Sequence, residues 1–239
     1  MTAHATEHDA PQFVADPPDD RHDSSVLAAA ALLLARRFSS GATLWCIAPG
    51  RDDHARHVAV EFVHPVIVGS PTLPSAAITG ADIVAEARAL VRSGDVVLLI
   101  GESACSPLAE LAARAQAWGA ALVWFCLHDQ PPVGAADVAV RCKNEADLVR
   151  AYHLVWELCH VCLQHPDVLT GPSSQQLTAP DCAVCSDEAV TAEVSGLARD
   201  GMVRVRTARG QIDAADLVGD LRVGDLVLTH AATVIGRRI

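Results

Sequence analysis

The sequence predicts an α/β fold, a doubly wound parallel sheet, followed by a small β-barrel domain. Two uninterrupted apolar runs, 96–100 and 121–126, alternate with segments of helical spacing, as in a parallel sheet covered by helices on both faces. The last quarter of the chain changes to short alternating strands around tight turns, a pattern typical of a small barrel. A stretch rich in Gly, Pro and Ser at 170–176 lies between the two patterns, and we therefore expect two domains.

Each element of the first domain has a local signal. Ser106 and Pro107 are a favourable N-cap and first position for a helix, and Gly119 is a favourable stop. Gly94 and Asp95 form a turn into the apolar run that follows. The predicted elements, in order, are helix 26–37, strand 44–47, helix 57–63, helix 83–92, strand 96–100, helix 106–118, strand 121–126, edge strand 137–141 and helix 144–164.

The barrel segment is predicted from alternation and turns. Val190, Ala192 and Val194 alternate in a first strand, and a second strand covers 203–207. A Gly224–Asp225 turn leads into an apolar strand that ends on His230. The predicted domain boundaries are 1–23 for a disordered acidic tail, 24–168 for the α/β domain, 169–181 for the linker and 182–239 for the barrel.

Composition excludes several classes of partner. The formal charge of −11 over 239 residues argues against nucleic acid, because phosphate binding needs a basic face. No apolar stretch reaches the length of a membrane span, and the ten-residue run 26–35 has acidic residues before it and arginines after it, the wrong polarity for a signal peptide. We expect a cytoplasmic protein whose eight cysteines are reduced thiols or metal ligands.

The C-terminal segment resembles the HypC/HupF family of hydrogenase-maturation chaperones. The residues that carry the resemblance are cysteines ahead of a strand, the run from Asp216 to Val218, and the Val-Gly-Asp-Leu-Val-Leu-Thr-His run that ends at His230. The resemblance implies an OB-like barrel that binds an iron bearing cyanide and carbon monoxide ligands. It also implies delivery of this iron to the large subunit of a nickel–iron hydrogenase, together with a HypD-type partner.

The same resemblance assigns roles to three residues of the barrel. The thiol that holds iron in the family matches Cys182 or Cys185, and His230 is the accompanying imidazole. Thiolates are suitable ligands for iron, copper(I) or zinc, and an imidazole can bind a metal or move a proton. The function expected from this segment is therefore that of a non-enzymatic metallochaperone.

Residues 24–165 resemble the sugar isomerase (SIS) fold, phosphoheptose isomerase in particular. The resemblance rests on the stretch from His57 to Phe62, on the run from Gly94 to Gly101 with its serine loop, and on Ala146–Asp147 at the start of the last helix. It implies a sugar-phosphate site at the strand ends, where backbone N–H groups favour an anion. It also implies isomerisation by a Glu and a His, with zinc in some members, and self-association into a homo-oligomer.

Read residue by residue, this isomerase site is incomplete. Glu61 matches the catalytic Glu and His57 the metal-binding His, and their spacing of four places them on one helix face. Arg150 and Leu158 stand where the family has a Gln and a second His; arginine binds no metal, and leucine moves no proton. We expect that this domain kept the isomerase fold but lost the isomerase activity, and that it serves oligomerisation or ligand sensing.

The predicted phosphate loops contain Arg51, Ser103 and Ser106, with Glu102 among them. A carboxylate ~4 Å from a phosphate charge costs roughly 4 kcal/mol at an effective dielectric constant near 20. A serine hydrogen bond returns only about 1 kcal/mol. Repulsion therefore dominates unless Arg51 neutralises Glu102.

Two alternatives to the chaperone function remain open at this point. One is a phosphoheptose isomerase or phosphosugar-binding protein that uses Glu61 as its base. The other is a structural zinc protein, because Cys159, Cys162, Cys182 and Cys185 fit a zinc-binding spacing. Against zinc, Cys159 and Cys162 continue a helical apolar stripe, which favours core packing.

Overall fold

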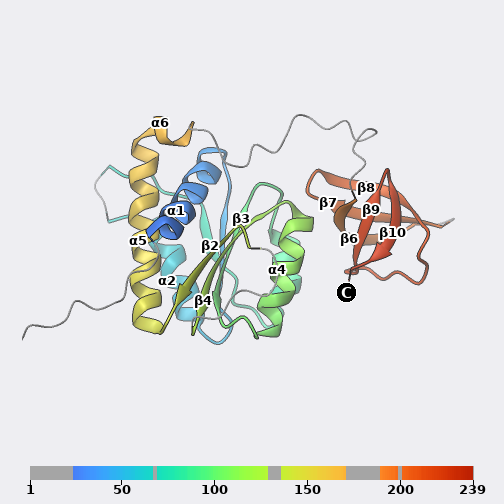
Figure 1. Cartoon of the computed structure of the whole chain (residues 1–239), viewed down its shortest axis with the longest axis horizontal. Helices are drawn as coiled ribbons and strands as arrows, with labels where there is room; N and C mark the ends of the chain where they lie inside the picture. Colours follow the sequence, from blue (N-terminus) through green and yellow to red (C-terminus); the bar gives the residue numbers. More distant parts are fainter. Residues whose placement is uncertain (1–23, 67–68, 129–135, 171–188, 199–200, 239) are drawn as a thin grey trace, which may run out of the picture.

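The computed structural model describes residues 24–66, 69–128, 136–170, 189–198 and 201–238. It contains an α/β domain and a closed barrel, which lies beside α4 (Figure 1). The helices are α1 (Ser24–Ser39), α2 (Asp52–Val63), α3 (Ile83–Leu90), α4 (Ser106–Trp118), α5 (Glu145–Gln164) and α6 (Pro166–Leu169). The strands are β1 (Leu44–Ile47), β2 (Ser75–Ala77), β3 (Val96–Gly101), β4 (Ala121–Leu127), β5 (Val138–Cys142), β6 (Val190–Leu197), β7 (Met202–Thr207), β8 (Gly210–Asp216), β9 (Leu226–His230) and β10 (Thr233–Arg237).

The five strands of the α/β domain form a parallel sheet in the order β2-β1-β3-β4-β5. Strands β3 and β4 are buried along their whole length, which explains their unbroken apolar sequence. The predicted parallel sheet is confirmed. The prediction lacked β2, a three-residue strand of Ser and Ala at the edge of the sheet, and the short helix α6.

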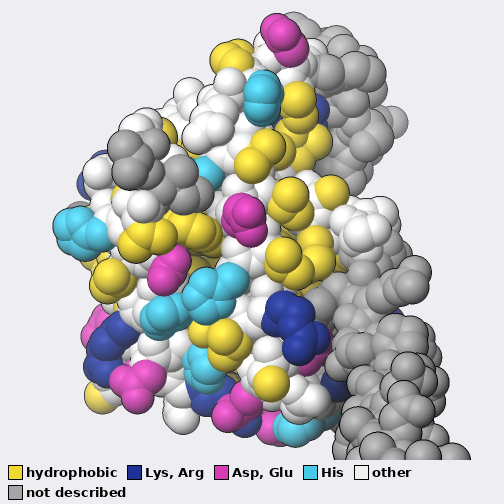
Figure 2. Space-filling view, turned by 90° about the vertical axis from the view of Figure 1, so that its left-hand side faces the viewer, with side chains coloured by type: hydrophobic (Ala, Val, Ile, Leu, Met, Phe, Trp, Pro, Cys, Tyr) yellow, Lys and Arg dark blue, Asp and Glu magenta, His cyan; other side chains and the backbone are white. Residues whose placement is uncertain are grey.

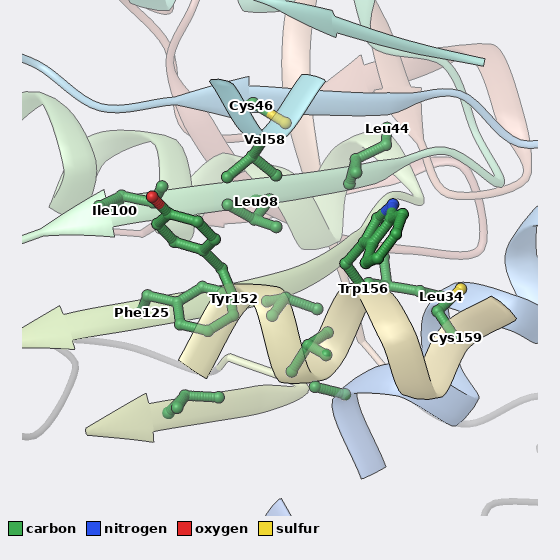
Figure 3. Close-up of a cluster of buried hydrophobic side chains, with 14 of the residues drawn as sticks. Leu34, Leu44, Cys46, Val58, Leu98, Ile100, Phe125, Tyr152, Trp156 and Cys159 are labelled. Atoms are coloured by element: carbon green, nitrogen blue, oxygen red, sulfur yellow. The ribbon is translucent and has the colours of Figure 1, made fainter. Parts of the chain in front are cut away.

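Two hydrophobic layers cover the sheet. Helices α1, α2 and α5 pack on one face, where Tyr152 and Trp156 point from α5 toward Leu98, Phe125 and neighbouring side chains of the sheet (Figure 3). Helices α3 and α4 pack on the other face, where Trp118 and Trp124 are fully buried. Alternate side chains of each strand enter opposite layers, as the pleat requires.

Helix boundaries follow from their caps. The Asn144 side chain accepts a hydrogen bond from the Asp147 amide at the start of α5, and Asp82 accepts one from Ala85 at the start of α3. Helix α4 ends at Gly119, whose φ of 73° lies in the left-handed region that favours glycine. Helix α2 starts at Asp52, five residues ahead of the predicted start at 57, because two acidic residues open its first turn.

The C-terminal segment closes into a five-stranded barrel in the order β10-β8-β7-β6-β9. Antiparallel pairing of β9 with β10 and parallel pairing of β10 with β8 complete the ring. Eight buried residues fill its interior: Ala192, Val194, Val203, Val205, Ala214, Leu221, Val227 and Val234. The predicted barrel is confirmed, with β8 and β10 as strands that the sequence did not indicate.

Two of the predicted segments fall outside the described residues: the acidic tail 1–23 and almost all of the linker 169–181. In the part of the chain that the structure describes, no helix combines the length and apolar character that a bilayer span requires. Cys159 is fully buried in α5 and Cys162 is half-buried beside the same core, so the helical stripe predicted for them is confirmed.

Candidate functional site

Helices α2 and α5 lie against each other on the same face of the sheet (Figures 1 and 3). The indole Nε1 of Trp156 donates a hydrogen bond to the carbonyl oxygen of Glu61 at 2.9 Å. At the other end of the pair, Arg51 Nε donates to Glu145 Oε1 at 3.3 Å. These two contacts hold the helices side by side in a parallel arrangement.

This arrangement brings three potential metal ligands together: His57 and Glu61 from α2, and His153 from α5. The two Nε2 atoms of His57 and His153 are 3.2 Å apart. Glu61 Oε1 lies 3.6 Å from His57 Nε2 and 3.9 Å from His153 Nε2. Among the described residues, these three form the one group of His, Cys, Asp or Glu whose donor atoms converge closely enough to bind an ion.

The donor distances fit a tetrahedral metal centre. Zinc binds histidine nitrogen and carboxylate oxygen at about 2.0–2.2 Å, which places neighbouring ligand atoms of a tetrahedron about 3.3 Å apart. Two histidines with one carboxylate are also a donor set found in catalytic zinc sites, where a fourth position stays open to water or substrate. The residues present therefore fit zinc or a similar divalent ion.

The orientation of His153 is fixed by its other ring nitrogen. Nδ1 of His153 donates to the carbonyl oxygen of Val149 at 2.7 Å, so in the neutral ring Nε2 carries the lone pair and faces His57 and Glu61. A hydrogen bond of this kind to the remote nitrogen is typical of metal-binding histidines. The Tyr152 ring packs against His153 at 4.7 Å between centroids and against His57 at 5.7 Å. Burial raises the pKa of Tyr152, and the nearby Glu61 carboxylate adds to the rise, so the phenol stays protonated.

One side of the cluster is open. The His57 side chain is 46% exposed, His153 40% and Glu61 23%. Several histidine side chains gather on this face of the molecule, with hydrophobic side chains around them (Figure 2). A fourth ligand or a substrate atom can therefore reach the cluster from solvent.

The second part of the site is the crevice at the carboxyl ends of β1 and β3. In a sheet of this strand order the chain changes direction between these two strands, and ligands commonly bind there. Arg51 follows β1 and Glu102 follows β3, and their side chains approach to 3.9 Å across the crevice. Arg51 also pairs with Glu145, and His128 lies 3.4 Å from Glu102.

Arg51 is thus shared between two carboxylates. Its single positive charge balances Glu102 or Glu145 but not both, so a phosphate dianion that enters the crevice must compete for it. Arg51 therefore lies close enough to Glu102 to offset its charge in part, but it does not neutralise this carboxylate fully.

The two predicted serines differ in their surroundings. Ser103 is 3% exposed, so its hydroxyl is closed to solvent. It lies beside Cys126, whose pKa burial raises to about 11 while Ser103 opposes the rise. Ser106 is exposed at the first turn of α4, where the N-cap residue Cys105 makes no side-chain cap. A ligand oxygen in the crevice could use the exposed Ser106 hydroxyl and the uncapped first amides of α4.

The sequence predicted His57 and Glu61 as a pair but did not predict His153. The signal for His153 lies in the packing of α5 on α2 and not in the local sequence. Arg150, which replaces a family Gln, is 3.9 Å from Asp147, and Leu158 packs against the core; neither enters the cluster. His230 is half-buried at the end of β9 in the barrel, separate from the cluster, and Cys182 and Cys185 lie outside the described residues.

Comparison with known proteins gives matches among solved structures only. No family model matches the sequence, and no curated protein matches it. The chain is similar to a phosphoheptose isomerase from Francisella tularensis, with 18% identity over 59% of this chain and 86% of the other, at a TM-score of 0.49. It is also similar to phosphoheptose isomerase GmhA from Neisseria gonorrhoeae, with 18% identity over 59% of this chain and 85% of the other, at a TM-score of 0.46. At this identity the likeness concerns architecture alone, and no finding supports the hydrogenase-maturation resemblance of the C-terminal segment.

Proposed function

We propose that the α/β domain binds a divalent metal ion of the zinc type through His57, Glu61 and His153, and acts on a phosphosugar beside it. The observation that carries the proposal is the convergence of three donor atoms at 3.2, 3.6 and 3.9 Å, with one side open. The reaction class is isomerisation of a hydroxy-carbonyl sugar phosphate. This revises the expectation of a lost isomerase site, because His153 supplies the imidazole that Leu158 cannot.

The chemistry requires a polarised carbonyl and a base. A bound divalent ion would polarise the sugar carbonyl as a Lewis acid. Glu61 is the one carboxylate of this cluster and would take the role of proton acceptor when it is not bound to the ion. His153 keeps its Nε2 lone pair directed into the cluster because Val149 holds its Nδ1 proton.

The crevice between β1 and β3 is suited to the phosphate end of such a substrate. Arg51 precedes His57 by six residues, so the loop lies about 9 Å from the cluster along the α2 axis, a separation that an extended sugar phosphate can span. The exposed Ser106 hydroxyl and the first amides of α4 supply donors, and the Glu102 carboxylate repels the phosphate. Phosphate binding at this loop is therefore weaker than in a loop of Gly and Ser alone.

Metal binding is tested on the full-length chain. Equilibrium dialysis against zinc, with the metal measured by plasma mass spectrometry, should give one ion per chain. The variants H57A and H153A should each lose stoichiometric binding, whereas H165A, an exposed histidine at the end of α5, should retain it. Equal zinc binding by the parent chain, H57A and H153A would contradict the metal site.

Activity is tested separately with sedoheptulose 7-phosphate and the zinc-loaded chain. Turnover should be measurable and should disappear in Glu61→Gln, which keeps the shape of the side chain and removes its basicity. A chain that binds zinc and the phosphosugar without product is a binding protein, and this result would refute the isomerase reaction while keeping the site.

A second candidate function is hydrogenase maturation by the barrel domain. This candidate rests on the sequence resemblance of the C-terminal segment, and the closed five-stranded barrel with His230 at the end of β9 is compatible with it. In this function Cys182 or Cys185 carries the iron, and the partners are a HypD-type protein and the hydrogenase large subunit. Anaerobic co-purification should yield infrared bands of bound cyanide and carbon monoxide. A double variant C182A/C185A that keeps these bands would exclude the role.

A further inference from the structure

The boundary between the two domains contains a cavity of about 350 Å³ that is separate from the metal cluster and the crevice. The α/β domain contributes Arg88, Arg92 and Ser93 from the end of α3 and the loop after it. The barrel contributes Arg206, Thr207 and Gln211 from β7 and β8. In a chain with a net charge of −11, the residues that line this cavity include three arginines and no carboxylate.

Two of the arginines are held in place before any ligand arrives. Arg206 donates from Nη1 to the carbonyl oxygen of Arg88 at 3.0 Å and from Nη2 to that of Val91 at 2.6 Å. Its guanidinium also lies over the Trp118 ring, 5.4 Å from the centroid. Arg88 Nε donates to the buried carboxylate of Glu193 at 2.8 Å. Donors that are fixed in advance lose little conformational entropy on binding.

These contacts leave donors unused. Each guanidinium has five N–H groups. The hydrogen bonds given above use one N–H group of Arg88 and two of Arg206. The exposed side chain of Arg92 has no hydrogen bond or ion pair with any residue in the described ranges, so it does not hold the two domains together. Burial lowers the pKa of Arg206, and the charge of Arg88 adds to this while Glu193 and Asp95 oppose it. An anion bound in the cavity would offset the repulsion between the Arg88 and Arg206 charges.

We propose that this interdomain cavity is a binding site for a small phosphate monoester, clamped by Arg88, Arg92 and Arg206. The planar guanidinium fork matches phosphate oxygens in pairs, and three such groups favour a dianion over a single carboxylate. The volume lies at the lower end of the range for small-molecule sites and suits a small ligand. Because each domain supplies part of the lining, the ligand also stabilises the docked arrangement of the barrel.

The test is calorimetric titration of the full-length chain with glycerol 3-phosphate and with inorganic phosphate, at low and high salt. Arg92→Ala should weaken binding by about tenfold, the value of one charge-assisted hydrogen bond, and Arg92→Glu should weaken it further. Arg222→Ala, at an exposed arginine of the barrel outside the cavity, is the matched control and should bind like the parent chain. Tighter binding of the monoester than of inorganic phosphate supports a metabolite site, and equal binding supports a free-phosphate site in the same cavity.

The crevice between β1 and β3 is the competing location for the same anion. If binding is lost in Arg51→Ala and unchanged in Arg92→Glu, the phosphate occupies the crevice and the interdomain site is wrong. An absence of heat with both anions also overturns it. Because the Arg92 side chain is exposed and has no hydrogen bond or ion pair in the described chain, its variants should fold, and a circular-dichroism melt verifies this before the titration.

Discussion

One buried carboxylate makes three of the hydrogen bonds that dock the barrel on the α/β domain. Glu193, on β6, is 2% exposed. Its Oε1 accepts hydrogen bonds from Arg88 Nε at 2.8 Å and Arg114 Nη1 at 2.6 Å, and its Oε2 accepts one from Trp118 Nε1 at 2.6 Å. All three donors come from α3 and α4. The substitution Glu193→Gln keeps the size of the side chain and removes its charge.

The expected loss of stability is large. Glutamine leaves Arg88 and Arg114 without their shared counter-charge, and its amide group must point N–H atoms at one of the three donors. Breaking a buried ion pair by removing one partner costs about 3–5 kcal/mol. A domain of ordinary stability has about 5–15 kcal/mol, so the loss is a substantial fraction of the total.

Urea unfolding of the full-length chain measures this loss, with tryptophan fluorescence reporting on the contact and circular dichroism on the whole fold. We expect a lower midpoint for Glu193→Gln and a separate, earlier fluorescence transition as the barrel leaves α4. Asp213→Asn is the matched control, since its exposed pair with Arg204 at 2.8 Å is screened by solvent and contributes little. If both variants have the same midpoint, Glu193 does not hold the interface and the reasoning is refuted.

Four further predictions concern stability, reactivity and assembly. Burial lowers the pKa of His160, which is 1% exposed, so the folded protein favours the neutral imidazole. The stability that this neutral side chain contributes is present above the unfolded pKa of about 6.5 and is lost as the pH falls. His160→Phe should therefore reduce the fall in melting temperature between pH 7 and pH 5. Gly119→Ala should lower the melting temperature, because a left-handed φ costs alanine about 1–2 kcal/mol. The new Cβ would also lie 2.8 Å from the Ala208 carbonyl oxygen of the barrel. An unchanged melting temperature would contradict this close approach of the barrel to Gly119. Burial raises the pKa of Cys46 to about 12, so iodoacetamide should modify it only after unfolding, as peptide mass spectrometry would detect. The exposed apolar side chains of α2 and α5, Val60 at 56% and Val161 at 45%, favour self-association, and a strictly monomeric mass in light scattering would exclude it.

The elements that sequence reasoning identified are those whose signals are local. The apolar runs of β3 and β4 are buried on both faces, and the caps of α4 and its final glycine are visible in the chain. Strands β2 and β8 were missed because their residues have low strand propensity, Ser-Ala-Ala in one and Gly and Asp in the other. Both form because a neighbour pairs with them, β1 with β2 and β7 with β8, so tertiary contacts override propensity.

The same distinction explains the candidate site. His57 and Glu61 are four residues apart on one helix, a spacing that the sequence shows directly. His153 joins them from a helix that follows 96 residues later, and only the packing of α5 against α2 reveals it. Glu193 was likewise not singled out, since in the alternating sequence of β6 it is one more polar residue. Its three donors come from helices more than 70 residues away.

Helix α4 connects the crevice to the barrel. Its first turn follows the loop of Glu102 and Ser103, and its last turns carry Arg114 and Trp118 onto Glu193. A shift of α4 at the crevice would have to draw both donors away from a buried carboxylate, at the full cost of leaving that charge unpaired. The docked barrel therefore stiffens α4 and, through it, the loop of Glu102 and Ser103. It also follows that the β6–β7 side of the barrel faces α4 and is covered, so a partner of the barrel would have to approach from another side.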